Sequence, residues 1–289
     1  MSDIVNHSTA VAEEGCEALC ARGFYLLLAG DVAAAEERFR RALALEPDYV
    51  WGYLGLAKTR LPGPGYLEVF SRLIDHLQPQ RYVEIGVEQG DVLKRFPAGV
   101  RIVGIDPEPQ CASPAPEISI FAQTSDRFFA GEDLSKLLGG PFDLAFIDGL
   151  HTFEQVLKDF INLERWAGPG SVVLIHDCLP LDRRTATPER ETLFWTGDVW
   201  KIIPCLRRER PDLALFTIPT YPAGLCVVSG LDPGSRVLAD GGERLAAVYQ
   251  ALDFAAIGEP GEYFSLVPNA WPEIRKRLTA GSGKGGPAA

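Results

Sequence analysis

The chain has 289 residues, with 39 acidic against 28 basic side chains, a formal net charge of −11 at neutral pH. Hydrophobic residues make up 46% and charged residues 23%, an ordinary globular composition that excludes wholesale disorder, collagen-like repeats and coiled coil. A negative field repels phosphate backbones and anionic lipid, so we expect neither nucleic acid nor a membrane as partner. The length exceeds one core domain of roughly 150 to 200 residues, so additional segments are expected.

Two further features place the chain in the cytoplasm. No apolar run approaches the roughly 20 residues of a membrane-spanning helix, and the N-terminus is acidic where a signal peptide would be basic. The cysteines are scattered without a C-x-x-C pair, which predicts reduced thiols and neither a zinc site nor a disulfide framework.

Residues 16–60 show apolar positions at three- and four-residue steps, with a break at Gly30-Asp31 and a stop at Pro47, which predicts two antiparallel helices. This stretch resembles a tetratricopeptide repeat over about 34 residues. The positions that carry the resemblance are Gly23, Gly30-Asp31, Ala35, Phe39, Ala42 and Glu46-Pro47. A second unit begins at Tyr49 and is cut off by the Pro- and Gly-rich residues 61–65.

One such repeat cannot bury its own apolar face. We therefore expect residues 1–63 to pack on the following domain or on a second copy of the chain, and a homodimer through these helices is one hypothesis. The alternative is a plain helical hairpin that completes the core.

From Tyr66 the pattern becomes an alternation of helix and strand. A helix at 67–77 precedes runs rich in Val and Ile, which predicts a parallel sheet with crossover helices. These runs are 81–86, 100–106, 118–123, 142–148 and 172–175. Two later runs, 214–219 and 225–230, are only five residues apart and form a hairpin.

The fold class predicted for residues 64–230 is therefore α/β, a doubly wound, Rossmann-like sheet of six parallel strands and one antiparallel strand. Residues 231–289 form a C-terminal extension, with helices near 242–254 and 272–278 and a flexible polar tail over the last nine residues.

The first strand runs into a turn that contains Gly86 and Gly90, with Glu84 at the strand end. Glycines let the backbone turn sharply and approach a ligand. A dinucleotide fingerprint needs a second glycine where Glu88 stands, and its carboxylate would repel a pyrophosphate. The turn thus disfavours a nicotinamide-dependent oxidoreductase and suits a cationic nucleoside without phosphate.

Asp106 ends the second strand about 20 residues downstream, where a carboxylate commonly holds the two hydroxyls of a ribose. The alternative is a turn residue before Pro107. The third strand leads into Thr124, Ser125 and Asp126, which stand where an adenine edge would lie or form an ordinary helix N-cap.

The motif E-I-G-x-x-x-G followed by G-I-D resembles the class I S-adenosylmethionine-dependent methyltransferases over residues 66–230. The resemblance implies that Glu84, Gly86 and Gly90 contact the methionine end of the cofactor and that Asp106 holds its ribose. It also implies that Ser125 and Asp126 lie near the adenine, and Asp148 is assigned to the same cofactor site.

The fourth strand is followed by Asp148 and His151, and the fifth by His176 and Asp177. Two carboxylates and two imidazoles at adjacent strand ends could bind a divalent cation, provide a general base, or both. Thr152 and Gln155 predict a capping box for a helix that ends at Gly168-Pro169-Gly170.

The pattern I-D-G-x-H-x-[YF]-E with a later H-D resembles a bacterial subgroup of these methyltransferases that acts on sugar or antibiotic hydroxyls, some of them magnesium-dependent. The resemblance implies Asp148 as a metal ligand and His151 as the base. Here His176 precedes Asp177 where the metal-dependent members have an acidic residue. The choice between an Mg²⁺ site of Asp148, Asp177 and His176 and a site without metal stays open, as does a purely structural role for His176.

The predicted activity is transfer of a methyl group to a hydroxyl of a small molecule, a sugar or natural product. His151 is the predicted general base, and Asp148 is counted with it as catalytic. The aromatic residues of the segment 194–201 are candidates for the acceptor wall, and Val199-Trp200 could equally be helix core before Pro204. The rival hypothesis is a noncatalytic partner-binding protein with a vestigial cofactor fold.

Overall fold

The computed structural model describes residues 14–113, 115–257 and 260–282. They divide between Thr59 and Arg60 into two compact units. Within these ranges, no helix combines the length and the apolar composition required to cross a bilayer.

The N-terminal unit consists of α1 (Cys16–Leu28), α2 (Val32–Leu45) and most of α3 (Val50–Arg60). Asp31 begins α2 by accepting a hydrogen bond from the Ala34 amide at 3.1 Å. Phe39 is fully buried, and its ring leaves no room for a β-carbon at Gly23 or Gly55. The small residues in α1 and α3 are thus explained by the packing of one aromatic ring.

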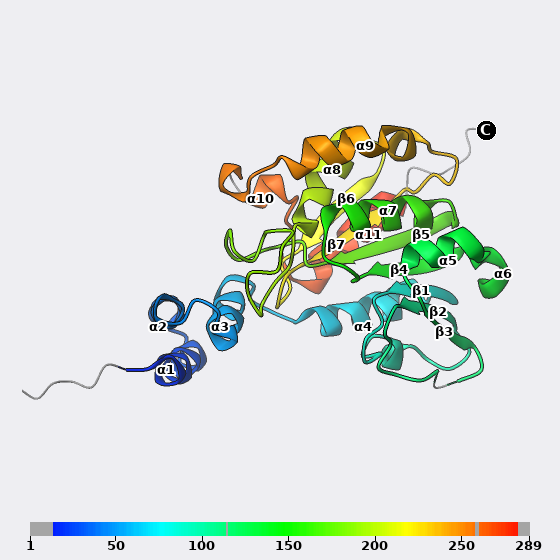
Figure 1. Cartoon of the computed structure of the whole chain (residues 1–289). Coiled ribbons are helices and arrows are strands. Elements are labelled where there is room, and N and C mark those ends of the chain that lie inside the picture. The colour runs from blue at the N-terminus through cyan, green and yellow to red at the C-terminus, as the bar shows by residue number, and fades with distance from the viewer. Residues whose placement is uncertain (1–13, 114, 258–259, 283–289) are drawn as a thin grey trace, which may run out of the picture. The chain divides into compact units, whose positions relative to one another are not determined.

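The second unit is built on a seven-stranded sheet (Figure 1). In chain order the strands are β1 (Arg81–Ile85), β2 (Arg101–Asp106), β3 (Ile118–Ala122), β4 (Phe142–Ile147), β5 (Ala167–His176), β6 (Ala214–Ile218) and β7 (Leu225–Ser229). In space they are ordered β3-β2-β1-β4-β5-β7-β6. Only β7 runs against the others, because it pairs antiparallel with both β5 and β6. The predicted sheet of six parallel strands and one antiparallel strand is confirmed.

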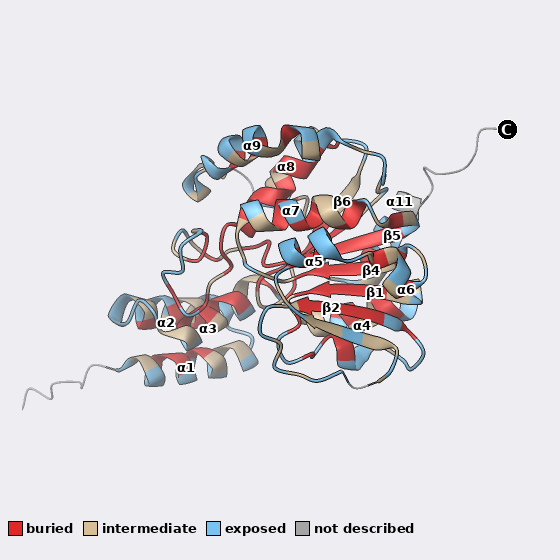
Figure 2. Cartoon of the chain, turned by 45° about the vertical axis from the view of Figure 1, so that its right-hand side comes forward, coloured by how far each residue is buried: buried red, intermediate tan, exposed pale blue. Residues whose placement is uncertain are grey.

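Helices cover both faces of this sheet. Two of them, α4 (Tyr66–Leu77) and α11 (Trp271–Ser282), share one buried cluster with the strands. The opposite face is covered by α5 (Ser125–Gly131), α6 (Leu134–Leu138), α7 (Phe153–Glu164), α8 (Ile202–Glu209) and α9 (Val237–Gln250). Figure 2 shows the central strands β1, β4 and β5 as predominantly buried, as expected for a parallel sheet enclosed by helices.

Two predicted boundaries are wrong. The helix predicted to end at 168–170 ends at Glu164, and the Gly-Pro-Gly residues belong to β5 instead. The pairing of β4 with β5 shifts register between Phe142 and Leu144, and such an irregularity tolerates a proline, which has no amide proton to donate. The C-terminal tail was predicted from residue 281, but α11 continues to Ser282; residues 283–289 lie outside the described residues.

The C-terminal helices begin earlier than expected. The helix predicted near 242–254 is α9, which spans Val237–Gln250, and a short 3-10 helix, η3 (Phe254–Ala256), follows it. A further short helix, α10 (Pro260–Tyr263), precedes α11. Buried side chains of α9 share the same cluster as α7 and α8, so this extension contributes to the core of the second unit.

Candidate functional site

The chain order places a crevice between β1 and β4. From β1 the chain continues outward through β2 and β3, then returns to β4 on the other side of β1. Doubly wound sheets bind ligands at the carboxyl ends of the strands at such a point. A cavity of about 790 Å³ lies there, lined by residues that follow β1, β2, β4 and β5 and by part of the segment 190–196; we call it the cofactor cavity.

Gly86 allows the ends of β1 and β4 to meet. Its φ is +89°, and a β-carbon at this position would lie 2.0 Å from the carbonyl oxygen of Asp148. The Asp148 amide donates to the Ile85 carbonyl at 2.8 Å. Gly90 is not part of the cavity wall; its amide closes the turn by donating to Val87 at 2.8 Å. The two glycines of the motif thus have different roles.

Asp106 ties the glycine turn to the end of β2. Its Oδ2 accepts hydrogen bonds from the amides of Val87 and Glu88, both at 2.9 Å, and its Oδ1 accepts one from Glu108 at 2.8 Å. Carboxylate oxygens have further lone pairs, so the side chain can hold the loop and still accept hydrogen bonds from a ligand in the cavity.

Gln155 of α7 links three acidic or hydroxyl side chains at the far end of the cofactor cavity. Its Nε2 lies 3.1 Å from both Ser125 Oγ and Asp126 Oδ1, and 3.0 Å from Asp159 Oδ1. The predicted capping box is therefore wrong, since Gln155 turns to the cavity and the Thr152 side chain makes no capping bond. Burial raises the pKa of Asp159 to about 6, against the opposing effect of its hydrogen bonds from Ser125 and Gln155.

Glu84 lies in the cavity wall at the end of β1 with 2% of its surface exposed. The hydroxyl of Tyr82 donates to its Oε2 at 3.1 Å. Burial raises the pKa of Glu84 well above its usual value, although this hydrogen bond lowers it. A buried carboxyl of this kind favours a cationic partner, because a nearby positive charge restores its ionised form.

Asp148, His151, His176 and Asp177 converge, as the strand order predicts. Nε2 of His151 lies 3.0 Å from Oδ2 of Asp177 and 3.5 Å from Oδ1 of Asp148. Nδ1 of His176 lies 3.2 Å from the same Asp148 oxygen and 3.5 Å from Oδ2 of Asp177. We call these four residues the Asp/His cluster.

The charges of the Asp/His cluster compensate one another. Burial alone would lower the pKa of His151, but the carboxylates of Asp177 and Asp148 outweigh burial and raise this pKa from 6.5 to about 9. The pKa of His176 is likewise raised well above its usual value by the same carboxylates, against burial. Burial raises the pKa of Asp148, but the two imidazoles outweigh it and hold that pKa below its usual value. In this arrangement the carboxylates favour the positively charged form of each imidazole.

An aromatic ring packs against each imidazole of the cluster. The indole of Trp195 stacks on the His151 ring, with centroids 5.5 Å apart and planes at 29°. The backbone carbonyl oxygen of Trp195 lies 3.3 Å from Nδ1 of His151. Tyr66, at the start of α4, lies over His176 with ring centroids 4.3 Å apart. Trp195 was a candidate from the sequence, whereas nothing in the pattern around Tyr66 indicated a place at the site.

Asp148, His151 and Asp177 form the group, among the described residues, whose ligand atoms could hold a metal ion, since these atoms lie within 4.8 Å of one another. His176, proposed from the sequence as a ligand, is not in this group, and its Nε2 is buried without a partner in the described part of the chain. Two carboxylates and one imidazole suit a cation that accepts both oxygen and nitrogen ligands.

Residues 83–178 match a family model described as a methyltransferase domain. The match begins in β1 and ends just after β5, so it covers the glycine turn, Asp106 and the Asp/His cluster. Together with the sheet order, it defines a methyltransferase domain of the Rossmann-like, class I fold. Residues 83–178 are thus similar to methyltransferase domains. The match does not reach residues 16–60, where the resemblance to a tetratricopeptide repeat stays a prediction.

Solved structures with similar folds include known methyltransferases. The O-methyltransferase TomG from Streptomyces achromogenes, involved in tomaymycin synthesis and solved with S-adenosylmethionine, is 18% identical; the alignment covers 61% of this chain and 88% of that one, with a TM-score of 0.41. An O-methyltransferase from Bacillus cereus, solved with S-adenosylhomocysteine, is 13% identical over 60% of this chain and 86% of that one, at a TM-score of 0.38. The Podospora anserina methyltransferase PaMTH1 is 16% identical over 64% of this chain and 89% of that one, with a TM-score of 0.42. No curated protein sequence matches the chain.

Proposed function

We propose that this chain is a methyltransferase that transfers the methyl group of S-adenosylmethionine to a hydroxyl of a small molecule, with His151 as the general base. The observation that carries the proposal is the position of the His151 imidazole, in the wall of the cofactor cavity beside Asp148 and Asp177. In the reaction the acceptor oxygen attacks the methyl carbon in line with the sulfur. The carbon–sulfur bond breaks, S-adenosylhomocysteine leaves, and the hydroxyl proton passes to the imidazole.

The cavity provides contacts for each part of the cofactor. The buried Glu84 carboxyl faces the ammonium group of the methionine end, Asp106 accepts hydrogen bonds from the ribose hydroxyls, and Ser125 and Asp126 lie at the adenine. Eight Asp or Glu residues and one Arg line the cavity. This excess of negative charge favours a cationic ligand, and the sulfonium and ammonium groups make S-adenosylmethionine one.

The base must be a neutral imidazole when it accepts the proton, whereas the two carboxylates keep a proton on His151 in the present arrangement. The residues fit a divalent cation, which Asp148 and Asp177 would hold through their oxygens. Bound there, such an ion would supply positive charge that lowers the pKa of the acceptor hydroxyl and favours the neutral form of His151. Chelation should then reduce the turnover rate, and added Mg²⁺ or Mn²⁺ should restore it. Turnover unchanged by chelation would remove the metal from the proposal.

The acceptor enters, in this proposal, beside the segment 190–196, where Leu193, Phe194 and Trp195 add apolar walls to an otherwise acidic cavity. Apolar and acidic walls favour a neutral or cationic acceptor, such as a sugar or natural product with a free hydroxyl. The identity of the acceptor is set by such loops more than by the sheet.

Calorimetric titration with S-adenosylmethionine tests the cofactor site first. Binding in the micromolar range is expected, and no heat at high micromolar ligand would favour the rival, a noncatalytic partner-binding protein. Transfer of a radiolabelled methyl group to a panel of hydroxyl, carboxyl and amine acceptors then tests the reaction. Transfer confined to amines or carboxyls would contradict the proposed hydroxyl specificity.

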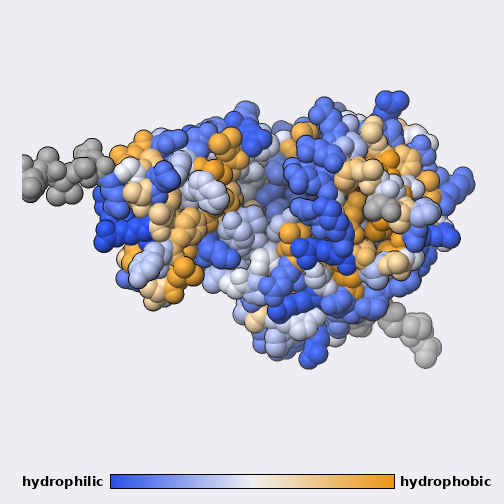
Figure 3. Space-filling view, turned by 90° about the horizontal axis from the view of Figure 1, so that it is seen from below, coloured by the Kyte–Doolittle hydropathy of each residue, from blue (hydrophilic) through white to orange (hydrophobic). Residues whose placement is uncertain are grey.

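We also propose a homodimer through the N-terminal unit. Five large hydrophobic side chains of this unit are exposed: Tyr25, Leu28, Val32, Leu45 and Trp51. Figure 3 shows apolar residues gathered on one face of these helices. A single repeat cannot bury an apolar surface of this kind by itself. Light scattering should give a dimeric mass, and the double variant Leu28→Glu/Trp51→Glu should give the monomeric mass. A monomeric wild-type protein would overturn this part of the proposal.

A further inference from the structure

A short segment, Trp195–Asp198, holds His151 from two sides. The indole and the carbonyl of Trp195 contact the imidazole ring. Gly197 has a φ of +63°, and a β-carbon there would lie 1.6 Å from the carbonyl oxygen of His151. The position of the backbone at 151 and the orientation of its ring are thus both set by this segment.

Asp198 anchors the segment to α7. Its Oδ1 accepts a hydrogen bond from the Phe153 amide at 2.6 Å. Phe153 is the first residue of α7, so its amide has no partner within the helix. The contact therefore connects the segment to the chain two residues after His151, and the carboxylate also lies at the positive end of the helix dipole.

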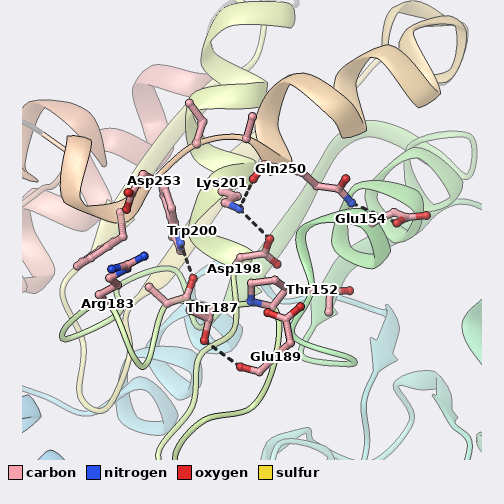
Figure 4. A pocket seen from close by; sticks show the side chains of 15 residues that line it. Thr152, Glu154, Arg183, Thr187, Glu189, Asp198, Trp200, Lys201, Gln250 and Asp253 are labelled. Atoms are coloured by element: carbon pink, nitrogen blue, oxygen red, sulfur yellow. Dashed lines mark hydrogen bonds and ion pairs between the residues drawn. The ribbon is translucent and has the colours of Figure 1, made fainter.

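Lys201 completes the anchor. Its Nζ lies 3.0 Å from Oδ2 of Asp198 and 2.9 Å from the carbonyl oxygen of Gln250, the last residue of α9. Both members of the pair are almost fully buried, with 3% and 5% of their side chains exposed. Figure 4 shows the pair beside a second cavity of about 600 Å³, with Lys201 between Asp198 and Gln250.

The order of contacts runs from the end of α9 through Lys201 and Asp198 to the start of α7. A buried ion pair adds little net stability, because its attraction repays the loss of hydration and little more. Thr152 stands at the N-cap of α7 without making a capping bond. Besides satisfying the Phe153 amide, the pair fixes the distance between the segment that contacts His151 and the helix that follows His151.

We propose that Asp198, whose charge Lys201 balances, is a positioning residue that holds His151 toward the cofactor cavity by fixing the segment Trp195–Asp198 to the start of α7. The functional meaning of this pair rests on the proposed role of His151 as the base. The contacts themselves do not depend on that role, so they can be tested without the acceptor.

Two double variants separate positioning from stability. Asp198→Ala/Lys201→Met removes both charges and the acceptor for the Phe153 amide. Asp198→Asn/Lys201→Met also removes both charges but keeps a carbonyl oxygen that can accept from that amide. Both variants avoid an unpaired buried charge, which single substitutions would leave behind.

The readout is the imidazole NMR spectrum of the full chain, which contains four histidines. The His151 signals are assigned by their loss in His151→Gln. Stacking on Trp195 shifts these ring protons upfield in the wild type. In Asp198→Ala/Lys201→Met we expect loss of this shift with His76 unchanged, and in Asp198→Asn/Lys201→Met we expect the shift to be kept.

Glu164→Gln is the matched control. Glu164 is at the other end of α7 and forms a buried bidentate pair with Arg210, with both distances 2.8 Å. This variant should lose stability without moving the His151 signals. An unchanged His151 shift in Asp198→Ala/Lys201→Met, or an equal change in Glu164→Gln, would overturn the proposal. If the wild type binds no S-adenosylmethionine, the proposed function fails while the NMR result still decides the positioning role.

Discussion

His151 and Asp177 meet at a distance of 3.0 Å between Nε2 and Oδ2, and both residues have a φ of 56°. They follow different strands, β4 and β5, and neither is a glycine. A left-handed backbone costs such residues about 1 kcal/mol or more each. The surrounding contacts hold both residues in this conformation, and strained conformations of this kind concentrate at functional sites. The backbone thus indicates a site here independently of the side-chain chemistry.

Replacing His151 by Ala should separate catalysis from cofactor binding. The proposed base is lost while the proposed cofactor contacts Glu84 and Asp106 remain, so turnover should fall by roughly a hundredfold or more and the affinity for S-adenosylmethionine should stay within about twofold. Methyl transfer and calorimetry measure the two quantities. His76→Ala is the control, because His76 is in the last turn of α4 and packs on Trp271. Full turnover in His151→Ala would show that the base is another group.

Replacing Asp106 should weaken cofactor binding. Asp106→Ala removes the hydrogen bonds to Val87 and Glu88 as well as the proposed ribose contact, so cofactor affinity should fall by at least about tenfold, or about 1.4 kcal/mol. Asp106→Asn keeps one side-chain oxygen, so its cofactor affinity should lie between that of Asp106→Ala and that of the wild type. Calorimetry measures both affinities.

Asp143 offers a matched control for Asp106. Its Oδ2 also accepts from two consecutive amides, those of Gln80 and Arg81, both at 2.9 Å. It is the second residue of β4 and lies beside Arg81, the first residue of β1, at the amino ends of these strands, whereas the cavity is at their carboxyl ends. Asp143→Ala should leave cofactor affinity unchanged. Equal losses of affinity in both alanine variants would mean that Asp106 acts only through the general stability of the sheet.

Gly86→Ala should abolish cofactor binding at micromolar concentrations. The added methyl group would meet the Asp148 backbone, and the φ of +89° disfavours any side chain. Either the turn or the end of β4 must shift, and both line the cavity. Gly131→Ala is the control, because a β-carbon there meets no atom within 4 Å. Wild-type affinity in Gly86→Ala would show that the cavity tolerates a shift of its own wall.

Much of this fold follows from local pattern. The apolar runs marked the strands closely because enclosed parallel strands are apolar on both faces. The error at residues 167–170 has a physical reason: glycine and proline usually end an element, and only the register shift between β4 and β5 lets β5 contain them. No local signal indicates such a shift.

The sequence predicted those parts of the candidate site whose residues directly follow the parallel strands. Asp106, Asp148, His151 and Asp177 come together because carboxyl ends of parallel strands share one edge. The roles of Tyr66 and Asp198 were not predictable, because each depends on packing between segments far apart in the sequence. The pairing of Asp198 with the Phe153 amide joins residues 45 positions apart, and no local pattern encodes it.

Asp159 should make stability depend on pH. Its pKa is raised by burial from 3.8 to about 6 in the folded protein, so the folded state binds the proton more tightly than the unfolded state. The free energy of unfolding therefore receives a contribution that is present below about pH 4 and is lost as the pH rises to about 6. The loss amounts to about 3 kcal/mol in order of magnitude. Asp159→Asn cannot titrate, so its stability relative to the wild type should increase between pH 4 and 6 and stay constant above. Urea unfolding of both proteins at several pH values measures this difference, and a difference independent of pH would show that the carboxyl titrates normally in the fold.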